Sequence, residues 1–290
     1  MPSGILIIDK SPGWTSQDAA AKLRGLYGER RVGHGGTLDP MATGVLPVFL
    51  GRATRAVEFF EHAEKEYVAG VRLGLTTDTE DTSGAVLSEQ PVHAAEAQVR
   101  AAVEALAGER EQVPPMYSAV KIGGRKLYEL ARAGKEIERK ARRITVIESE
   151  LLDGGGAHWR FRVLCSKGTY VRTLCRALGE TLGCGGCMES LRRTRAGCFG
   201  LDGAHTIEEI MAMPPEARLS LLLPVDRLFS RYPALPLTEN QTRRVKCGGT
   251  FSLPCADGTY RFYGPDGEFL ALGRVETGTA STVKSFFEVN

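Results

Sequence analysis

Apolar residues follow two different periods along the chain up to Phe199. Contiguous or alternating apolar positions predict strands at residues 4–9, 45–50, 67–75, 117–122, 144–152, 159–165 and 188–199. Apolar residues that recur every three or four positions predict helices at residues 15–27, 52–62, 94–107, 125–133 and 169–182. Because strands and helices do not alternate strictly, the pattern favours an α+β fold with a largely antiparallel sheet over a doubly wound parallel one.

Capping residues predict where two of these helices begin. Thr15 precedes Asp18 by three residues, the spacing of a capping box, so a helix should follow Thr15 directly. Thr169 is predicted to cap the helix that ends at Gly183. The polar residues 76–84 are expected to form a loop.

The pattern changes after residue 232. Pro233 and Pro236 predict a linker, and residues 238–246 a single helix. Short strand-like segments follow, separated by turn sequences at residues 248–249, 257–258 and 266–267. We therefore predict two domains, residues 1–232 and a small β-rich domain of residues 233–290, the latter expected to form a β-barrel packed on its neighbour.

Composition adds that this is an ordinary globular chain. It has 290 residues, 42% of them hydrophobic, which is enough for a sizeable core. The apolar run at residues 5–8 is too short for a signal peptide, and no window approaches 18 uninterrupted apolar residues. We expect a cytoplasmic protein without a membrane partner, and we expect its seven cysteines to be reduced.

The net charge of +2 conceals an uneven distribution. Residues 61–111 contain eleven acidic and four basic side chains, whereas residues 121–143 contain nine basic and three acidic ones. A basic segment in a nearly neutral protein suits a polyanion such as nucleic acid. A solvated helix face that happens to be basic explains the same pattern about equally well.

The segment from Gly33 to Leu50 is the most informative for function. Three glycines and Pro40 surround Asp39, so the carboxylate should stand on an extended backbone in a loop that a substrate can approach closely. From these residues alone, a turn in which Asp39 and Thr37 bond their own backbone is the simpler interpretation.

The order of several motifs alters this interpretation. Residues 34–47, His-Gly-Gly-Thr-Leu-Asp-Pro-Met-Ala-Thr-Gly-Val-Leu-Pro, resemble the catalytic motif of the TruB family of tRNA pseudouridine synthases. Further stretches that resemble the family follow in the same order, at residues 65–67, 72–81, 114–128, 166–173 and 191–194, and residues 4–14 resemble its start. The resemblance covers essentially the whole chain.

This resemblance implies a pseudouridine synthase fold, with a central, mostly antiparallel mixed sheet flanked by helices and a C-terminal PUA-like RNA-binding domain. It implies isomerisation of a uridine to pseudouridine in the T arm of tRNA, at position 55. The target base leaves its stack and meets an aspartate nucleophile. No atom is gained or lost, so no cofactor or metal is expected. We expect tRNA as the partner, a monomer and no obligate protein partner.

The resemblance also implies roles for individual residues. Asp39 is the nucleophile, and the nearby Arg172 is expected to hold the pKa of its carboxyl down. Tyr67 stacks on the extruded base and assists proton removal. The remaining candidates contact or shape the substrate site, and they are His34, which holds the RNA loop, Gly35 and Gly36, which allow close approach, and Lys10, Tyr170 and Leu191, which shape the pocket.

Three alternatives stay open at this point. The Cys184–Cys187 spacing could belong to a zinc or redox site, although a second ligand pair is missing. A non-catalytic RNA chaperone would share every RNA-binding feature and lack only the reaction at Asp39. The guide-RNA-dependent branch of the same family works with partner proteins, and no extra segment here calls for them.

Overall fold

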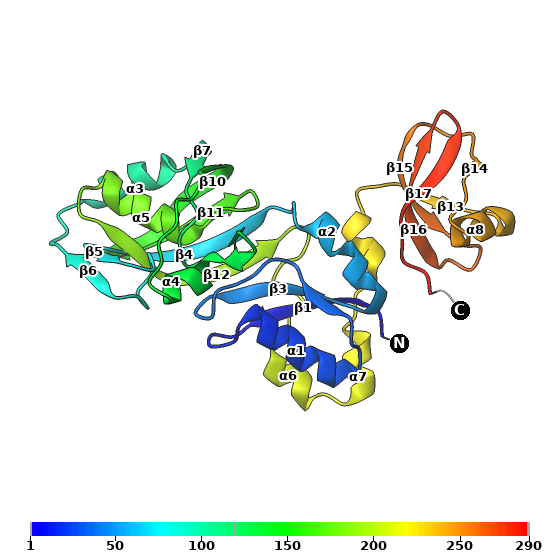
Figure 1. The fold of residues 1–290 in the computed structure, drawn as a ribbon, viewed down its shortest axis with the longest axis horizontal. Helices are drawn as coiled ribbons and strands as arrows, with labels where there is room; N and C mark the ends of the chain where they lie inside the picture. Colours follow the sequence, from blue (N-terminus) through cyan, green and yellow to red (C-terminus); the bar gives the residue numbers. More distant parts are fainter. Residues whose placement is uncertain (1, 119, 289–290) are drawn as a thin grey trace.

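A computed structural model describes residues 2–118 and 120–288 of the chain (Figure 1). Its main feature is an eight-stranded sheet in the order β1-β3-β12-β4-β11-β10-β7, with β2 paired to β3. The strands are β1 (Gly4–Lys10), β2 (Val32–His34), β3 (Thr43–Leu50), β4 (Lys65–Leu73), β7 (Gly108–Gln112), β10 (Arg142–Gly155), β11 (His158–Cys165) and β12 (Gly186–Ala196). Among the described strands of this sheet only the β12–β3 pair is parallel, so the predicted α+β fold with a mostly antiparallel sheet is confirmed.

That parallel pair is a narrow seam between two halves of the sheet. It consists of two residue pairs, Arg192 with Thr43 and Arg193 with Gly44. Strands β1 to β3 lie on one side of the seam, and β12, β4, β11, β10 and β7 lie on the other. Gly44 has a φ of +99°, and a Cβ atom at this position would lie 2.2 Å from the backbone oxygen of Arg193. A glycine therefore lets the two halves meet closely.

Helices cover the sheet and fix the ends of the segments that form the site. They are α1 (Ser16–Tyr27), the 3-10 helix η1 (Gly51–Ala56), α2 (Val57–Phe60), α3 (Glu96–Glu104), α5 (Val171–Thr181), α6 (Ile207–Ala212), α7 (Pro215–Ser220) and the 3-10 helix η2 (Val225–Phe229). The capping box at Thr15 is confirmed, because its hydroxyl accepts a bond from the Asp18 amide at 3.0 Å. The prediction for Thr169 was wrong. Tyr170 is the N-cap of α5, and the Thr169 hydroxyl instead donates to the Ser166 carbonyl at 3.0 Å.

The main core lies between the sheet and these helices. On β4, Tyr67, Ala69, Val71 and Leu73 face this core, whereas the alternate positions Glu66, Val68 and Arg72 are only partly covered. The strand predicted at residues 67–75 breaks at Gly74, where a φ of +80° turns the chain into a separate hairpin. This hairpin pairs β5 (Leu75–Thr77) with β6 (Val86–Glu89), so the predicted loop begins within a strand.

The basic segment forms a small unit of its own. Strands β8 (Lys121–Ile122) and β9 (Arg125–Lys126) make a hairpin that leads into α4 (Leu127–Arg132). The strand predicted at residues 117–122 is therefore shorter than expected, and its position 119 lies outside the described residues. Seven of the nine basic side chains in residues 121–143 are exposed.

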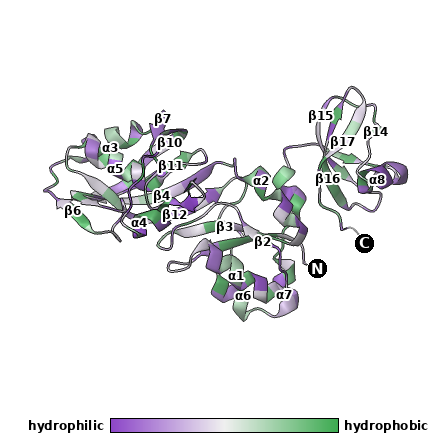
Figure 2. Cartoon of the chain, viewed as in Figure 1, coloured by the Kyte–Doolittle hydropathy of each residue, from purple (hydrophilic) through white to green (hydrophobic). Residues whose placement is uncertain are grey.

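The C-terminal part folds into a second, five-stranded sheet. Its order is β13-β15-β16-β17-β14, from β13 (Ala234–Pro236), β14 (Phe251–Ser252), β15 (Gly258–Tyr263), β16 (Phe269–Glu276) and β17 (Thr279–Ser285), and α8 (Glu239–Lys246) packs beside it. Figure 2 shows α8 as a mainly hydrophilic helix. The linker predicted from Pro233 and Pro236 was wrong at residues 234–236. They form an edge strand, where a proline is tolerated because one side of the strand lacks a partner.

Aromatic contacts attach this sheet to the rest of the chain. The ring of Phe229 lies between Phe59, at 5.3 Å edge-on, and Phe286, at 5.6 Å. Lys284 also pairs with Glu58 at 2.5 Å. The division into domains at residue 232 stays a prediction. Among the described residues, no helix is both long and apolar enough to cross a membrane.

Replacing Gly44 by alanine should test the seam. We expect Gly44→Ala to lower the free energy of unfolding by about 2–4 kcal/mol, because the alanine would have to adopt a positive φ and its Cβ atom would clash with the backbone of Arg193. Gly28→Ala is the matched control, since Gly28 has a φ of +61° and a Cβ atom there would meet nothing within 4 Å. Urea denaturation of both variants measures the difference, and equal losses would contradict a close approach at the seam.

Candidate active site

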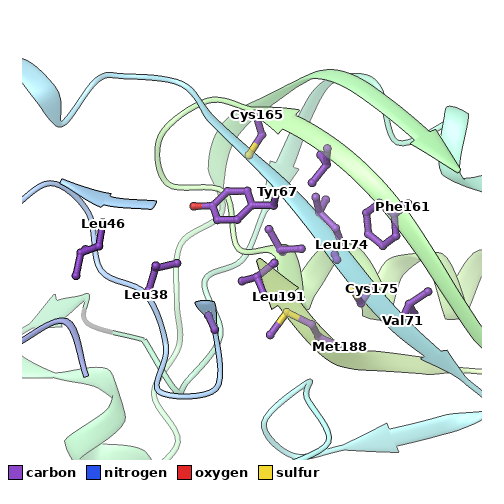
Figure 3. Close-up of a cluster of buried hydrophobic side chains, with 14 of the residues drawn as sticks. Leu38, Leu46, Tyr67, Val71, Phe161, Cys165, Leu174, Cys175, Met188 and Leu191 are labelled. Carbon is purple, nitrogen blue, oxygen red and sulfur yellow. The ribbon is translucent and has the colours of Figure 1, made fainter. Parts of the chain in front are cut away.

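The loop between β2 and β3 places Asp39 at the seam. Ser16, at the start of α1, fixes the residue before it, because its hydroxyl accepts a bond from the Leu38 amide at 2.8 Å and donates to the Leu38 carbonyl at 3.2 Å. The Leu38 side chain is buried in the main core (Figure 3). After the aspartate, the Ala42 amide donates to the Asp39 carbonyl at 3.0 Å. The carboxylate therefore stands on a backbone that is held on both sides.

Lys10 is fully buried beneath the same loop. Its ammonium group donates to three backbone carbonyls, those of Ser11 at 3.0 Å, Trp14 at 2.7 Å and Pro40 at 3.2 Å. Burial lowers the pKa of Lys10 to about 8, while the negative charge of Asp39 opposes this shift. In this arrangement Lys10 holds the loop, whereas the sequence suggested a residue that shapes the pocket directly.

Arg172 joins the loop to the other half of the sheet. It lies in the first turn of α5, with its side chain only 7% exposed, and its Nε atom is 3.2 Å from Oδ2 of Asp39. Its remaining nitrogens donate to the carbonyls of Thr79 at 3.1 Å and Tyr117 at 2.7 Å. The predicted pair of Asp39 and Arg172 is present in the structure.

Asp81 is a site residue that the sequence analysis did not single out. Its buried carboxylate lies 3.6 Å from Nη1 of Arg172 and accepts bonds from Thr79 and Ser83. Its position in the motif of residues 72–81 was the only signal in the sequence that pointed to it. One guanidinium thus lies between two carboxylates that come from separate loops.

Arg172 lowers the pKa of Asp39, as expected, but burial outweighs this effect. The pKa of Asp39 is raised from 3.8, chiefly because burial disfavours the charged form. The Arg172 guanidinium lowers it, the Asp81 carboxylate raises it, and Lys10 lowers it again. The side chain is still 37% exposed, so a reactant can reach the carboxylate.

Tyr67 and Leu191 form an apolar wall beside the loop. Figure 3 shows the hydroxyl end of Tyr67 directed toward the loop that carries Leu38, with Leu191 on the neighbouring strand. Both residues are 9% exposed. Burial raises the pKa of Tyr67, and the positive charge of Arg193 opposes this rise. The structure therefore brings the predicted aromatic residue to the site, with most of its ring covered.

The other predicted residues surround this centre. Tyr170 is held through its backbone, because its amide donates to Gln112 at 2.7 Å and its carbonyl accepts from the same side chain at 3.0 Å. His34 is half-buried, and its Nδ1 atom has no hydrogen-bond partner among the described residues. Burial and the charge of Arg193 lower the pKa of His34, so its imidazole is neutral at neutral pH.

The two glycines of the loop differ in their environments. Gly36 is exposed and has a φ of +90°, as expected for a loop glycine. Gly35 is buried, and a Cβ atom there would lie 2.4 Å from the ring of Phe60. Gly35 is thus required for packing against a core ring, and the role of Gly36 in substrate approach stays a prediction.

The cysteine pair does not lie in a group of ligands. Cys184 and Cys187 are both buried free thiols. Within residues 2–118 and 120–288, no group of three or more His, Cys, Asp or Glu side chains is arranged to hold a metal ion.

Comparison with protein families gives two adjoining matches. A profile described as the N-terminal domain of TruB family pseudouridylate synthase matches residues 24–171. A second profile, described as the C-terminal domain of tRNA pseudouridylate synthase B, matches residues 172–230. Together they span both loops that contribute the two carboxylates and the helix that contributes Arg172.

Curated relatives match over nearly the full length. The tRNA pseudouridine synthase B of Aromatoleum aromaticum is 49% identical over 280 residues, covering 96% of this chain and 91% of the relative. That of Geobacillus thermodenitrificans is 44% identical over 282 residues, covering 93% of each chain. That of Thermobifida fusca is 41% identical over 295 residues, covering 99% of each chain.

Solved structures share the fold at lower identity. A chain in the archaeal box H/ACA sRNP Nop10–Cbf5 complex has 25% identity and a TM-score of 0.72, covering 99% of this chain and 86% of its own length. A chain in a Cbf5–Nop10–Gar1 complex has 26% identity and a TM-score of 0.73, covering 98% and 85%. The likeness extends through both sheets.

Changing Arg172 should show how far the two carboxylates depend on it. We expect Arg172→Met to lower the free energy of unfolding by about 3 kcal/mol at neutral pH, because a buried carboxylate loses its cation. The loss should shrink as the pH falls, since protonation removes the unpaired negative charge. Arg172→Lys keeps the charge and should lose less. Denaturation at several pH values measures this, and a pH-independent loss would contradict the ion-pair explanation.

Proposed function

Because the chain belongs to the TruB family of pseudouridylate synthases and is an isomerase that forms pseudouridine in tRNA, we propose that its target is the uridine at position 55 of the T arm. We propose further that Asp39 is the nucleophile and that the target base is extruded from its stack. The observation that carries this proposal is the accessible Asp39 carboxylate, held 3.2 Å from the buried Arg172 guanidinium.

The reaction needs a carboxylate that is ionised and fixed in place. It breaks the bond between C1′ and N1, turns the uracil and joins C1′ to C5, which loses its proton. Asp39 acts as the nucleophile toward C1′ of the ribose or C6 of the uracil. Although burial raises its pKa, the charges of Arg172 and Lys10 favour the ionised form. The bonds from Ser16 and Lys10 to the loop keep its orientation.

Extrusion of the base requires something to replace its lost stacking. Base flipping costs a few kcal/mol, and an aromatic face returns about 1–3 kcal/mol per base. We propose that Tyr67 presents the uncovered part of its ring to the uracil and assists removal of the C5 proton, with Leu191 and Tyr170 beside it. His34, neutral and with an Nδ1 atom that lacks a partner among the described residues, holds the RNA loop after the base has left.

The basic segment of residues 121–143 supplies phosphate contacts in this proposal. Its exposed side chains include Lys121, Arg125 and Arg132. The carbonyl of Tyr117, just before the segment, accepts a bond from Arg172, so the RNA-binding segment is tied to the catalytic pair. Such contacts strengthen binding without reading the sequence of the RNA.

We assign residues 1–232 to catalysis and residues 233–290 to a PUA-like RNA-binding domain. The exposed Arg243 and Arg244 of α8 are its candidate contacts to the acceptor side of tRNA. We propose a monomer that needs no guide RNA and no obligate protein partner. The support is the 41–49% identity to relatives named tRNA pseudouridine synthase B, against 25–26% for the chains in complexes with Nop10.

Mapping of the product on tRNA transcripts tests the target. Carbodiimide treatment followed by primer extension should reveal one pseudouridine, at position 55. A transcript with cytidine at that position should give no product, whereas cytidine at a uridine of the anticodon loop should change nothing. Product in the first transcript would refute the target.

A variant with Lys121, Arg125 and Lys126 changed to glutamine should bind tRNA more weakly. Its rate of pseudouridine formation at saturating tRNA should stay unchanged.

A further inference from the structure

The residues of the site come from opposite sides of the seam. Asp39 lies in the loop that precedes β3, whereas Tyr67 lies on β4 and Arg172 on α5, both beyond β12. Among the described strands, the two halves of the sheet are hydrogen-bonded to each other only through the short β12–β3 ladder. A ladder of two residue pairs leaves the distance between the loop and Tyr67 dependent on additional contacts.

Arg193, at the centre of this ladder, supplies such contacts. It pairs with Gly44 on β3 and with Tyr67 on β4 in the strand register. Its side chain is 1% exposed, with Nε donating to the Val45 carbonyl at 2.7 Å and Nη2 to the Gly36 carbonyl at 3.1 Å. The side chain thus joins the start of the Asp39 loop to the strand after that loop, while the backbone of the same residue pairs with the strand that carries Tyr67.

The charge of Arg193 is unusual in its surroundings. Among the described residues, no carboxylate lies within ion-pair distance of it, while two other buried cations, Lys10 and Lys65, lie near it. A buried charge without a counter-ion costs stability, and an apolar side chain of similar volume is often neutral or better. Stability alone therefore does not explain an arginine at this position. The several N–H donors of its planar guanidinium, which bind two backbone carbonyls at once, do explain it.

The neighbouring Arg192 has the opposite surroundings. Its side chain is 42% exposed, and its Nη2 atom pairs with Oδ2 of Asp9 at 2.7 Å. Its Nη1 atom lies 3.5 Å from the Thr43 hydroxyl, so its polar contacts are with β1 and β3 and lie outside the loop of residues 35–40. The two arginines therefore form a natural comparison on one strand.

We propose that Arg193 is a positioning residue of this enzyme, which sets the Asp39 loop against Tyr67 across the seam. This inference rests on the proposed role of Asp39. Arg193 acts through the Gly36 and Val45 carbonyls and through its backbone pairing with Tyr67, and it does not itself take part in bond formation. Loss of the two guanidinium hydrogen bonds should displace the Asp39 loop while the substrate-binding surfaces stay intact.

Single-turnover kinetics with excess enzyme tests this proposal. We expect Arg193→Met to slow pseudouridine formation about 100-fold and to change the Kd for tRNA less than about threefold, because misplacement affects the reacting atoms more than the binding surface. Arg192→Met, the matched control, should keep the rate within about threefold, since its contacts lie outside the loop. Melting temperatures are measured for both, and the rates are repeated at a lower temperature.

Each outcome decides the proposal. A slow, folded Arg193→Met whose relative rate does not recover on cooling supports positioning, whereas recovery on cooling indicates a purely structural role and refutes it. If Arg193→Met does not fold, Arg193→Lys decides, since it keeps the charge but cannot bond both carbonyls. A lysine variant with full rate refutes the proposal. Asp39→Asn, assayed in parallel, separates this result from a failure of the proposed nucleophile, because that failure would leave Asp39→Asn active.

Discussion

The site depends on one buried guanidinium that is shared between two carboxylates. Arg172 contacts Asp39 and Asp81, and it also binds the carbonyls of Thr79 and Tyr117. It therefore fixes the loop before β3, the loop between β5 and β6 and the residue Tyr117 ahead of the basic segment relative to α5. Burial raises the pKa of Asp39, and the neighbouring Arg172 guanidinium opposes this rise. The same contact that orients Asp39 thus also favours its charged form.

The sheet explains why such a contact is needed. Its two halves meet through a two-residue parallel ladder, with the proposed nucleophile on one side and the aromatic wall on the other. Arg172 and Arg193 both cross this seam, the first through the side chain of Asp39 and the second through backbone carbonyls of the loop. Lys10 and Ser16 hold the loop from its own half. In the proposed mechanism, the catalytic geometry therefore depends on how the two halves are joined.

The sequence predicted what local chemistry determines. The capping box at Thr15 and the glycine-rich loop around Asp39 depend on neighbouring residues, and the resemblance to the family supplied the pair with Arg172. Contacts between distant segments were not predictable. The burial that raises the pKa of Asp39, the ring of Phe60 that requires Gly35 and the three carbonyls that occupy Lys10 arise only after folding. Likewise, the prolines at residues 233 and 236 indicated a linker. Residues 234–236 form a strand because they pair with β15, which lies more than twenty residues further along the chain.

The most direct measurement is tritium release from tRNA labelled at C5 of uridine, with the protein compared with its Asp39→Asn variant. Forming pseudouridine displaces the hydrogen at C5, so the release follows the reaction itself. Asparagine keeps the shape of the side chain and removes the charge. We expect about one equivalent of tritium per tRNA from the protein and none from a variant that still binds tRNA, because a neutral amide cannot replace the proposed carboxylate nucleophile. Release by Asp39→Asn at a comparable rate would contradict the central role given to Asp39.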